Sequence, residues 1–273
     1  MSELEVAVIG AGPTGLVAAL ALARNGLEVA LVAPPAAAGA GSPDPRPNSA
    51  SDAANERVRP AAGDRRTTAL IGPSVQLLLN LEAWQACAPH AAPLAAIRMA
   101  DDRQGLIRAP ELLFTAAEIG LDSFGANLPN PVLLDALRAA ARRAPRLAWV
   151  ETAGVINIAP DIGHGASWVR LALAEGGSVE ARLAVAADGR ASRAPAAAGI
   201  AVETWDYPQT ALVCSFDHSR PHAGTVNELH RQTGPLTTVP LPGQRSALVW
   251  VEAPDAARRL AGLGDGPFAE ALE

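Results

Sequence analysis

The sequence predicts an α/β fold that opens on a Rossmann-like βαβ unit. A short apolar run from Leu4 to Ile9 suits a buried parallel strand. Apolar residues then recur at helical spacing from Pro13 to Arg24, and Asn25-Gly26 provides a stop signal. A second apolar run follows from Glu28 to Ala33. Strand, helix and strand in this order are typical of a parallel sheet covered by helices.

Three glycines join the first strand to the helix at G-x-G-x-x-G spacing. Gly10 permits a tight turn, Gly12 lets a pyrophosphate approach the backbone, and Gly15 lets the helix pack closely, with the phosphates at the positive helix end. The pattern predicts a dinucleotide site; a glycine turn in an ordinary βα unit is the alternative. The second strand ends in Ala33-Pro34 instead of the usual acidic ribose ligand. This departure does not choose between FAD and NAD(P).

Composition narrows the class of protein. The chain has 273 residues, 49% of them apolar, so it can bury one large or two modest domains. A net charge of −6 without a basic cluster argues against nucleic acid as a partner. All 22 basic residues are arginine, which excludes lysine Schiff-base chemistry. Cys87 and Cys214 lack the spacing of a metal or redox motif, so no metal site is expected.

Targeting signals are also missing from the sequence. No apolar run is long enough to span a bilayer, and the first apolar run is itself the predicted nucleotide-binding strand. We therefore expect a cytoplasmic protein.

Further signals follow along the chain. Residues 34–64 are rich in Pro, Ala, Gly, Ser and Asp and predict a mobile loop. Ser74 is a candidate cap for a helix running to about Trp84. In "NPVLLDALRAAARRAP", Asn130 as cap and Pro131 at the first helical position predict another helix. Farther on, an apolar strand ends in Asp188-Gly189, which places an acidic group at the ligand edge of an open α/β sheet.

One pair of histidines receives little weight. His218 and His222 lie four residues apart in "DHSRPH", but Pro221 breaks any helix there and no third metal ligand is evident. We interpret the pair as part of a surface loop.

Five motifs in order carry a resemblance to a known family: "GAGPTG", "DRRTTAL", "NPVLLDAL", "AADGRASRAPAAAGI" and "WDYPQTALVC". With them the chain resembles the flavin-dependent aromatic-ring hydroxylases of the para-hydroxybenzoate hydroxylase type. The stretch "WDYPQTALVC" and the later "GPLTTVPLPGQRSALVW" are most similar to the ubiquinone-biosynthesis branch.

The resemblance implies two interleaved domains. A Rossmann-like FAD-binding domain would comprise residues 1–95 and 126–200. A smaller α+β substrate domain, built on a mainly antiparallel sheet, would comprise residues 96–125 and 201–273. Related enzymes continue to a Gly-Asp motif that contacts the flavin, whereas this sequence stops at "GPFAEALE". We therefore expect the substrate domain to be incomplete and the chain to be truncated at its C-terminus.

The resemblance also implies which residues bind the cofactors. FAD would be the bound dinucleotide and NAD(P)H the reductant. The implied FAD-binding residues are Gly10, Gly12, Gly15, Arg66, Asn130, Asp188 and Gly189. Each of two residues has a simpler alternative to cofactor binding. Arg66 could be a solvated charge in a loop, and Asn130 could be only the cap of the helix that follows it. Where the family has an arginine seven residues after the aspartate, this chain has Pro195, with Arg193 two positions early.

The implied activity is hydroxylation of a phenol, with a prenyl tail, on the route to ubiquinone. The flavin performs the difficult chemistry, so no catalytic nucleophile or general base is assigned. An apolar tail implies contact with the inner membrane or with a ubiquinone-synthesis complex. Two alternatives remain: a noncatalytic flavin-fold subunit or fragment, and an NAD(P)-dependent Rossmann dehydrogenase. The Asp188-Gly189 motif and the absence of a Tyr-x-x-x-Lys pair weigh against the second.

Overall fold

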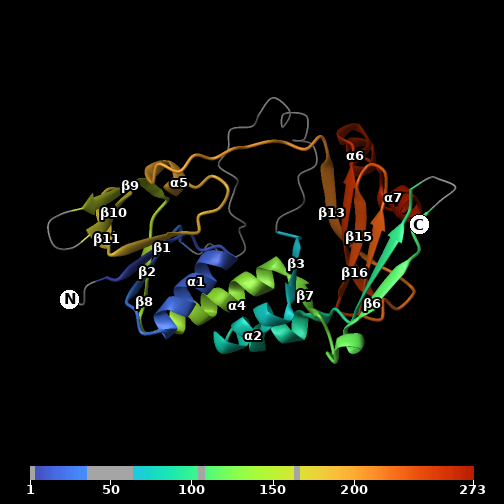
Figure 1. Cartoon of the computed structure of the whole chain (residues 1–273), viewed down its shortest axis with the longest axis horizontal. Helices are drawn as coiled ribbons and strands as arrows, with labels where there is room; N and C mark the ends of the chain where they lie inside the picture. Colours follow the sequence, from blue (N-terminus) through green and yellow to red (C-terminus); the bar gives the residue numbers. More distant parts are fainter. Residues whose placement is uncertain (1–3, 36–63, 104–107, 163–166) are drawn as a thin grey trace.

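The computed structural model describes residues 4–35, 64–103, 108–162 and 167–273. A parallel sheet lies at one end of the elongated molecule and a larger, mainly antiparallel sheet at the other, with helices α1, α4 and α2 between them (Figure 1). The predicted loop at 34–64 falls almost entirely outside the described residues.

The parallel sheet contains the predicted βαβ unit. Its strand order is β12-β1-β2-β8, and all neighbours are parallel. The bounds are β1 Val6–Ile9, β2 Val29–Ala33, β8 Leu147–Glu151 and β12 Leu183–Ala186. Helix α1 (Pro13–Arg24) connects β1 to β2 and has the bounds that the sequence predicts, and α4 (Asn130–Arg143) precedes β8.

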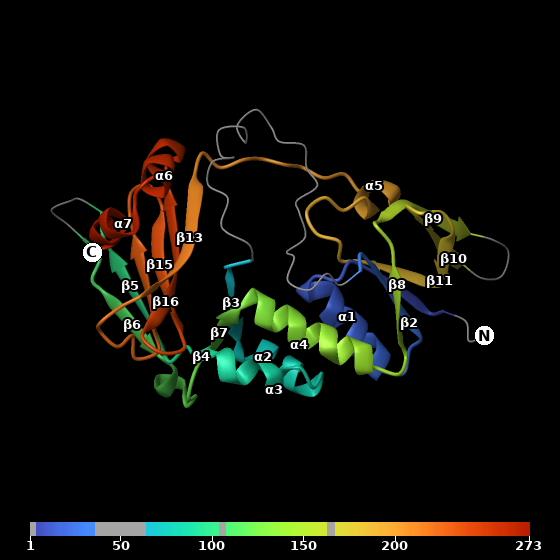
Figure 2. The same ribbon diagram turned by 180° about the vertical axis from the view of Figure 1, so that it is seen from behind.

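Both faces of this sheet are covered, because successive side chains of a strand point to opposite faces. Val6 and Val8 pack with α1 and α4 in one apolar cluster, whereas Ala7 and Ile9 pack in a second. The second cluster includes Leu171 from a three-stranded antiparallel sheet over the other face (Figure 2). The strands of that sheet are β9 Val155–Ile162, β10 Ser167–Leu173 and β11 Ser178–Ala181.

The larger sheet has six strands in the order β13-β16-β15-β14-β5-β6. Every neighbouring pair is antiparallel except β14 and β5. The bounds are β5 Ala96–Asp101, β6 Leu112–Thr115, β13 Thr210–Asp217, β14 Thr225–His230, β15 Pro235–Leu241 and β16 Arg245–Glu252. Helices α6 (Pro254–Ala261) and α7 (Asp265–Leu272) follow, and their Leu260 and Phe268 pack on Trp250 and Leu248 of β16. The predicted fold class is confirmed: a Rossmann-like part and a second, mainly antiparallel α+β part.

A small third sheet lies between the two larger ones. Its order is β3-β7-β4, with bounds β3 Thr67–Ile71, β7 Gly125–Pro129 and β4 Ala92–Pro93. Short helical segments complete the described chain: α2 Gly72–Asn80, α3 Trp84–Cys87, a 3₁₀ turn Ala88–His90, a 3₁₀ turn Ala116–Ile119, and α5 Ala194–Ala197. The helix predicted from Ser74 to about Trp84 is present but with other bounds: α2 ends at Asn80, and Ser74 lies inside it and provides no cap.

Candidate functional site

Two of the three motif glycines are required by close backbone packing. Gly10 has φ +100°, and a Cβ placed on it would lie 2.6 Å from the Ala187 carbonyl oxygen. A Cβ on Gly15 would lie 1.9 Å from the Gly10 carbonyl oxygen. No residue with a side chain fits either position without moving the backbone. The turn therefore brings β1, α1 and the end of β12 together.

Gly12 differs, because a Cβ placed on it would meet no protein atom within 4 Å. It is the extended residue just before α1, and α1 has Pro13 at its start, no side-chain cap and no acidic residue in its first turn. Backbone N–H groups at a helix start carry partial positive charge and bind phosphate well. The open space at Gly12 thus fits the pyrophosphate of a dinucleotide.

The Asp188-Gly189 segment lies beside this turn. β12 runs parallel to β1, and the Ala187 N–H donates to the Ile9 carbonyl at 2.9 Å, so both strands end at the same edge. Gly189 has φ +88° and turns the chain away from the sheet. The Asp188 side chain is exposed. The structure therefore places the glycine turn and the Asp188-Gly189 segment at the same edge of the parallel sheet.

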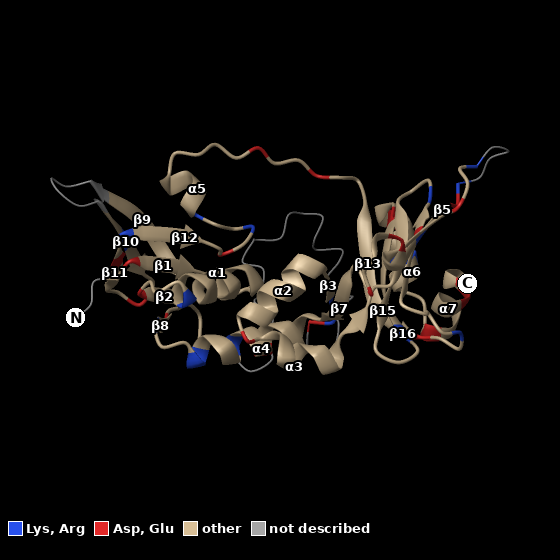
Figure 3. Cartoon of the chain, turned by 60° about the horizontal axis from the view of Figure 1, so that its bottom comes forward, with Lys and Arg blue, Asp and Glu red and all other residues tan. Residues whose placement is uncertain are grey.

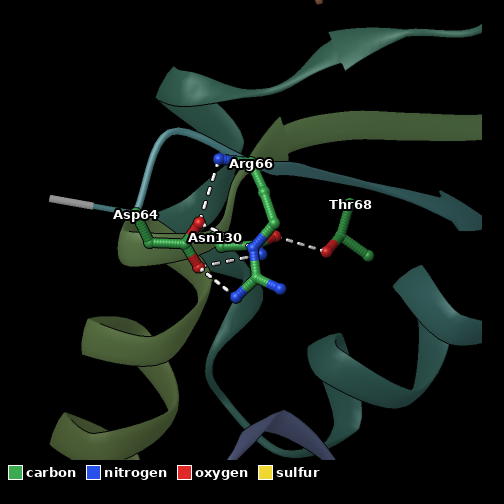
Figure 4. A network of polar contacts seen from close by, with 4 residues as sticks. All are labelled: Asp64, Arg66, Thr68 and Asn130. Atoms are coloured by element: carbon green, nitrogen blue, oxygen red, sulfur yellow. Dashed lines mark hydrogen bonds and ion pairs between the residues drawn. The ribbon is translucent and has the colours of Figure 1, made fainter. Parts of the chain in front are cut away.

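Arg66 and Asn130 belong to a second group, which is a network built on Asp64 (Figure 4). The Arg66 guanidinium donates to both Asp64 carboxylate oxygens, at 2.8 and 2.9 Å. The Asn130 side-chain amide donates to Asp64 at 3.2 Å, and its oxygen accepts a 2.6 Å hydrogen bond from the Thr68 hydroxyl. The bidentate bond from Arg66 lowers the pKa of Asp64 to about 2 and raises that of Arg66.

This network corrects the interpretation of two residues. Asn130 is not the cap of α4 but its first residue, because Pro129 occupies the cap position and no side-chain cap bond forms. Its side chain points instead to Asp64 and Thr68 (Figure 4). Arg66 is exposed but is held by Asp64 as a bidentate pair. Among the described residues, no hydrogen bond or ion pair joins this network directly to the glycine turn.

A pocket of about 460 Å³ opens beside the network. The small third sheet and the residues before it contribute Asp64, Arg65, Thr67 and Pro129; the six-stranded sheet contributes Cys214, Ser215, Leu241 and Arg245. Volumes in this range suit small organic ligands. Arg66, outside the lining, pairs with Asp64, and the lining itself contains the two arginines Arg65 and Arg245. Arg245 also lies 4.0 Å from the exposed carboxylate of Asp217, so the net charge around the pocket is modestly positive.

Sequence reasoning missed Asp64, Arg65 and Arg245 as site residues. Asp64 and Arg65 lie directly before Arg66 in "DRRTTAL", so the motif itself could have drawn attention to them. No local signal distinguishes Arg245, because the pocket forms between β16 and residues nearly two hundred positions earlier in the chain.

Other chemistry finds little support in the part of the chain that the structure describes. It contains no group of three or more His, Cys, Asp or Glu residues that could hold a metal ion. Burial raises the pKa of both thiols, Cys87 and Cys214. Among the residues drawn in Figure 3, arginines are scattered over several elements instead of forming one basic face. No described helix is long and apolar enough to cross a bilayer.

Arg193, which precedes α5, forms a hydrogen bond with the backbone of a neighbouring sheet. Its guanidinium donates to the Ile156 carbonyl of β9 at 3.1 Å. Arg193 thus fastens the segment before α5 to the sheet that covers the Rossmann-like part.

Comparisons with known proteins agree with this geometry. Residues 3–39 match the FAD binding domain family, which selects FAD as the dinucleotide. The chain is 29% identical to a ubiquinone hydroxylase of Rhodospirillum rubrum, over 98% of this chain and 56% of the relative. It is 27% identical to 3-demethoxyubiquinol 3-hydroxylase of Escherichia coli, over 94% of this chain and 59% of the relative. The chain therefore spans little more than half the length of these relatives.

Solved structures share the fold. PqsL of Pseudomonas aeruginosa superposes with a TM-score of 0.69 at 18% identity, over 95% of this chain and 63% of that protein. The p-nitrophenol 4-monooxygenase of Pseudomonas putida superposes with a TM-score of 0.63 at 17% identity, over 100% and 62%. These structures confirm the fold, and the sequence matches confirm the family resemblance that the motifs predicted.

Proposed function

We propose that this chain, a relative of the FAD-dependent aromatic hydroxylases of the ubiquinone-biosynthesis branch, binds FAD and takes part in hydroxylating a phenol with NAD(P)H and O₂. The observation that carries the proposal is the pairing of two sites. A turn shaped for a dinucleotide ends the parallel sheet, and a positively charged pocket lies between the network on Asp64 and the six-stranded sheet.

The FAD-binding residues follow from the first site. Gly10 and Gly15 keep the turn compact, and Gly12 leaves room at the start of α1 for the pyrophosphate. Asp188 and Gly189, on the neighbouring strand end, would contact the cofactor along the same edge. Arg66 and Asn130, fixed by Asp64, would contact it where it leaves the sheet toward the pocket.

The pocket would hold the aromatic ring of the substrate. When bound, the flavin supplies the reduction of oxygen and the transfer of one oxygen atom to the ring. The residues of this chain bind, orient and shield the ring. Arg65 and Arg245 favour a ligand with negative charge, and Leu241 contributes an apolar wall. A phenol becomes more reactive toward oxygen transfer as its hydroxyl loses its proton, so positive charge beside the ring assists the reaction.

The names of the relatives support a substrate of the ubiquinone route. A phenol with an isoprenoid tail is poorly soluble in water. We therefore infer that the chain takes up this substrate at a membrane surface or from a partner protein that presents lipid. The described part of the chain contributes no spanning helix to such a contact.

The activity is tested with the FAD-loaded chain, NAD(P)H and a short-chain prenylphenol. We expect the phenol to stimulate NAD(P)H oxidation and to yield a product heavier by one oxygen atom. Arg245→Gln should raise the KM for the phenol about threefold, because an exposed ion pair contributes up to about 1 kcal/mol. Arg170→Gln is the matched control, since Arg170 pairs with Glu180 on the covering sheet. Bound FAD without stimulation by any phenol would contradict hydroxylation by this chain.

A further inference from the structure

Two histidines in the connection between β13 and β14 form a packed pair. The rings of His218 and His222 meet edge to face, with centroids 5.7 Å apart and an interplanar angle of 78°. Both are half-buried, and every ring nitrogen has a partner. The pair lies in a loop, as the sequence predicts, but both rings are half-buried and hydrogen-bonded, which the sequence did not indicate.

The hydrogen-bond partners of His222 determine which ring nitrogen carries the proton. Its Nε2 lies 3.0 Å from the carbonyl oxygens of both Leu241 and Gly243, and its Nδ1 lies 3.0 Å from the backbone nitrogen of Gly224. A carbonyl can only accept a hydrogen bond and a backbone N–H can only donate one. The ring must then carry its proton on Nε2 and leave Nδ1 free to accept. The arrangement suits the neutral imidazole alone.

The partners of His218 impose no such restriction. Its Nδ1 lies 2.7 Å from the Arg220 carbonyl oxygen and therefore carries a proton. Its Nε2 lies 3.0 Å from the Ser246 hydroxyl, which can donate or accept as needed. A second proton on His218 therefore keeps both bonds, whereas a second proton on His222 sets two N–H groups against each other at Gly224.

His222 connects three strands through these bonds. Ala223 and Gly224 have φ +49° and +69°, and the first value is unfavourable for a residue with a Cβ. The Gly224 carbonyl accepts from Ala95 and Ala96, where β5 begins. The side chain of His222 thus ties the β15–β16 turn to the starts of β14 and β5.

The residues on either side of the β15–β16 turn line the pocket. Leu241 precedes the turn and Arg245 follows it, and both line the 460 Å³ pocket. The His218 N–H also holds the turn, through a 3.0 Å bond to the Gln244 carbonyl. The ladders that pair Leu241 with Arg245 and Asp217 with Arg245 hold the two strands on either side of the turn, so loss of the His222 bonds would loosen the turn without unpairing the strands.

We propose that His222 is a positioning residue that holds the pocket wall of Leu241 and Arg245 in place only while its imidazole is neutral. The nearby charges are Arg220, two residues earlier, and Arg245, whose Nε lies 4.0 Å from the Asp217 carboxylate. The hydrogen-bond partners of the His222 ring are two carbonyls and a backbone N–H, none of which compensates the charge of an imidazolium that donates from Nδ1. The use of this wall for a phenol rests on the proposed function; the proton assignment does not.

Nitrogen NMR of the imidazoles tests the assignment in the chain without ligand. At neutral pH we expect the proton on Nε2 for His222 and on Nδ1 for His218, opposite tautomers in adjacent rings. A proton on Nδ1 of His222, or an imidazolium there at neutral pH, would overturn the proposal.

Variants test the positioning role. When the pH is lowered from about 7.5 to about 5.5 and His222 gains a second proton, the wild-type chain should lose amide-exchange protection over residues 238–246, after correction for intrinsic rates. Its affinity for 4-propylphenol, which stays neutral across this range, should fall at least about threefold. His222→Gln keeps an N–H that can reach the two carbonyls and does not titrate, so its affinity should be near wild type and flat with pH. His222→Leu should bind 4-propylphenol weakly at every pH in this range.

The matched control is His90→Gln, in an exposed 3₁₀ turn, which should behave as wild type. A His222→Gln profile that follows the wild-type pH dependence would overturn the proposal, as would tight binding by His222→Leu. A parallel FAD titration reports on the proposed function by itself. If no phenol binds at any pH while the exchange profiles behave as expected, the proposed substrate site fails and the role of His222 in holding the turn stands.

Discussion

Gly10 and Asp188 are in backbone contact: a Cβ on Gly10 would lie 2.8 Å from the Cα of Asp188. This contact joins the first strand of the chain to a segment almost 180 residues later. The glycine motif and the Asp-Gly motif therefore form one structural unit at the edge of the parallel sheet.

Gly10→Ala should destabilise the fold itself. Its φ of +100° is unfavourable for alanine, and the added methyl would lie 2.6 Å from the Ala187 carbonyl oxygen. Backbone strain and overpacking together should lower the free energy of unfolding by about 3 kcal/mol. Urea denaturation measures this change. Gly154→Ala is the control, since a Cβ there meets nothing within 4 Å, and an equal loss in both variants would contradict the packing argument.

Asp64→Asn should destabilise the chain at neutral pH and less so in acid. The pKa of Asp64 is lowered to about 2 in the folded chain, so its ionised form stabilises the fold above the unfolded value of 3.8. That stabilisation fades as the pH falls from about 4 toward 2. Because the Arg66 side chain is 69% exposed, the effect at pH 7 should be only about 1 kcal/mol. Unfolding curves of both proteins at pH 7 and pH 3 measure it, and a difference that grows in acid would contradict the pairing.

Asn127 should tolerate an apolar replacement better than a charged one. It is fully buried on β7, and its amide donates at 2.9 Å to the Pro240 carbonyl on β15, which links the small sheet to the six-stranded sheet. Asn127→Asp would replace this donor with a carboxylate facing a carbonyl, at a cost of about 3 kcal/mol at pH 7. Asn127→Leu should cost about 1–2 kcal/mol. Chemical denaturation of both variants gives the order, and a less stable Leu variant would contradict it.

Local signals in the sequence were sufficient to predict the βαβ unit. Strand, glycines, Pro13 and the Asn25-Gly26 stop lie within one stretch, and α1 has the predicted bounds because propensity and tertiary packing agree there.

Long-range partners explain what the sequence did not predict. The local sequence around Asn130 is typical of a helix cap. Its side chain instead forms hydrogen bonds with Asp64 and with Thr68, which lies 62 residues earlier. His222 reaches carbonyls 19 and 21 residues later, which no spacing rule anticipates. In both cases the hydrogen-bond partners of the side chain are distant in the sequence. Local patterns cannot reveal such partners, so they predicted a helix cap for Asn130 and a surface loop for His222.

The central claim is that FAD lies on the turn at Gly12, and a titration of the purified chain with FAD tests it most directly. Flavin fluorescence and absorbance would be followed for the wild type, Gly12→Val and the control Gly154→Ala. A Cβ at Gly12 meets no protein atom within 4 Å, so Gly12→Val should fold normally while filling the space for the pyrophosphate. We expect saturable one-to-one binding by the wild type and the control, and at least about a tenfold loss for Gly12→Val, equivalent to 1.4 kcal/mol. Equal FAD affinity in all three proteins, or none in the wild type, would contradict the claim.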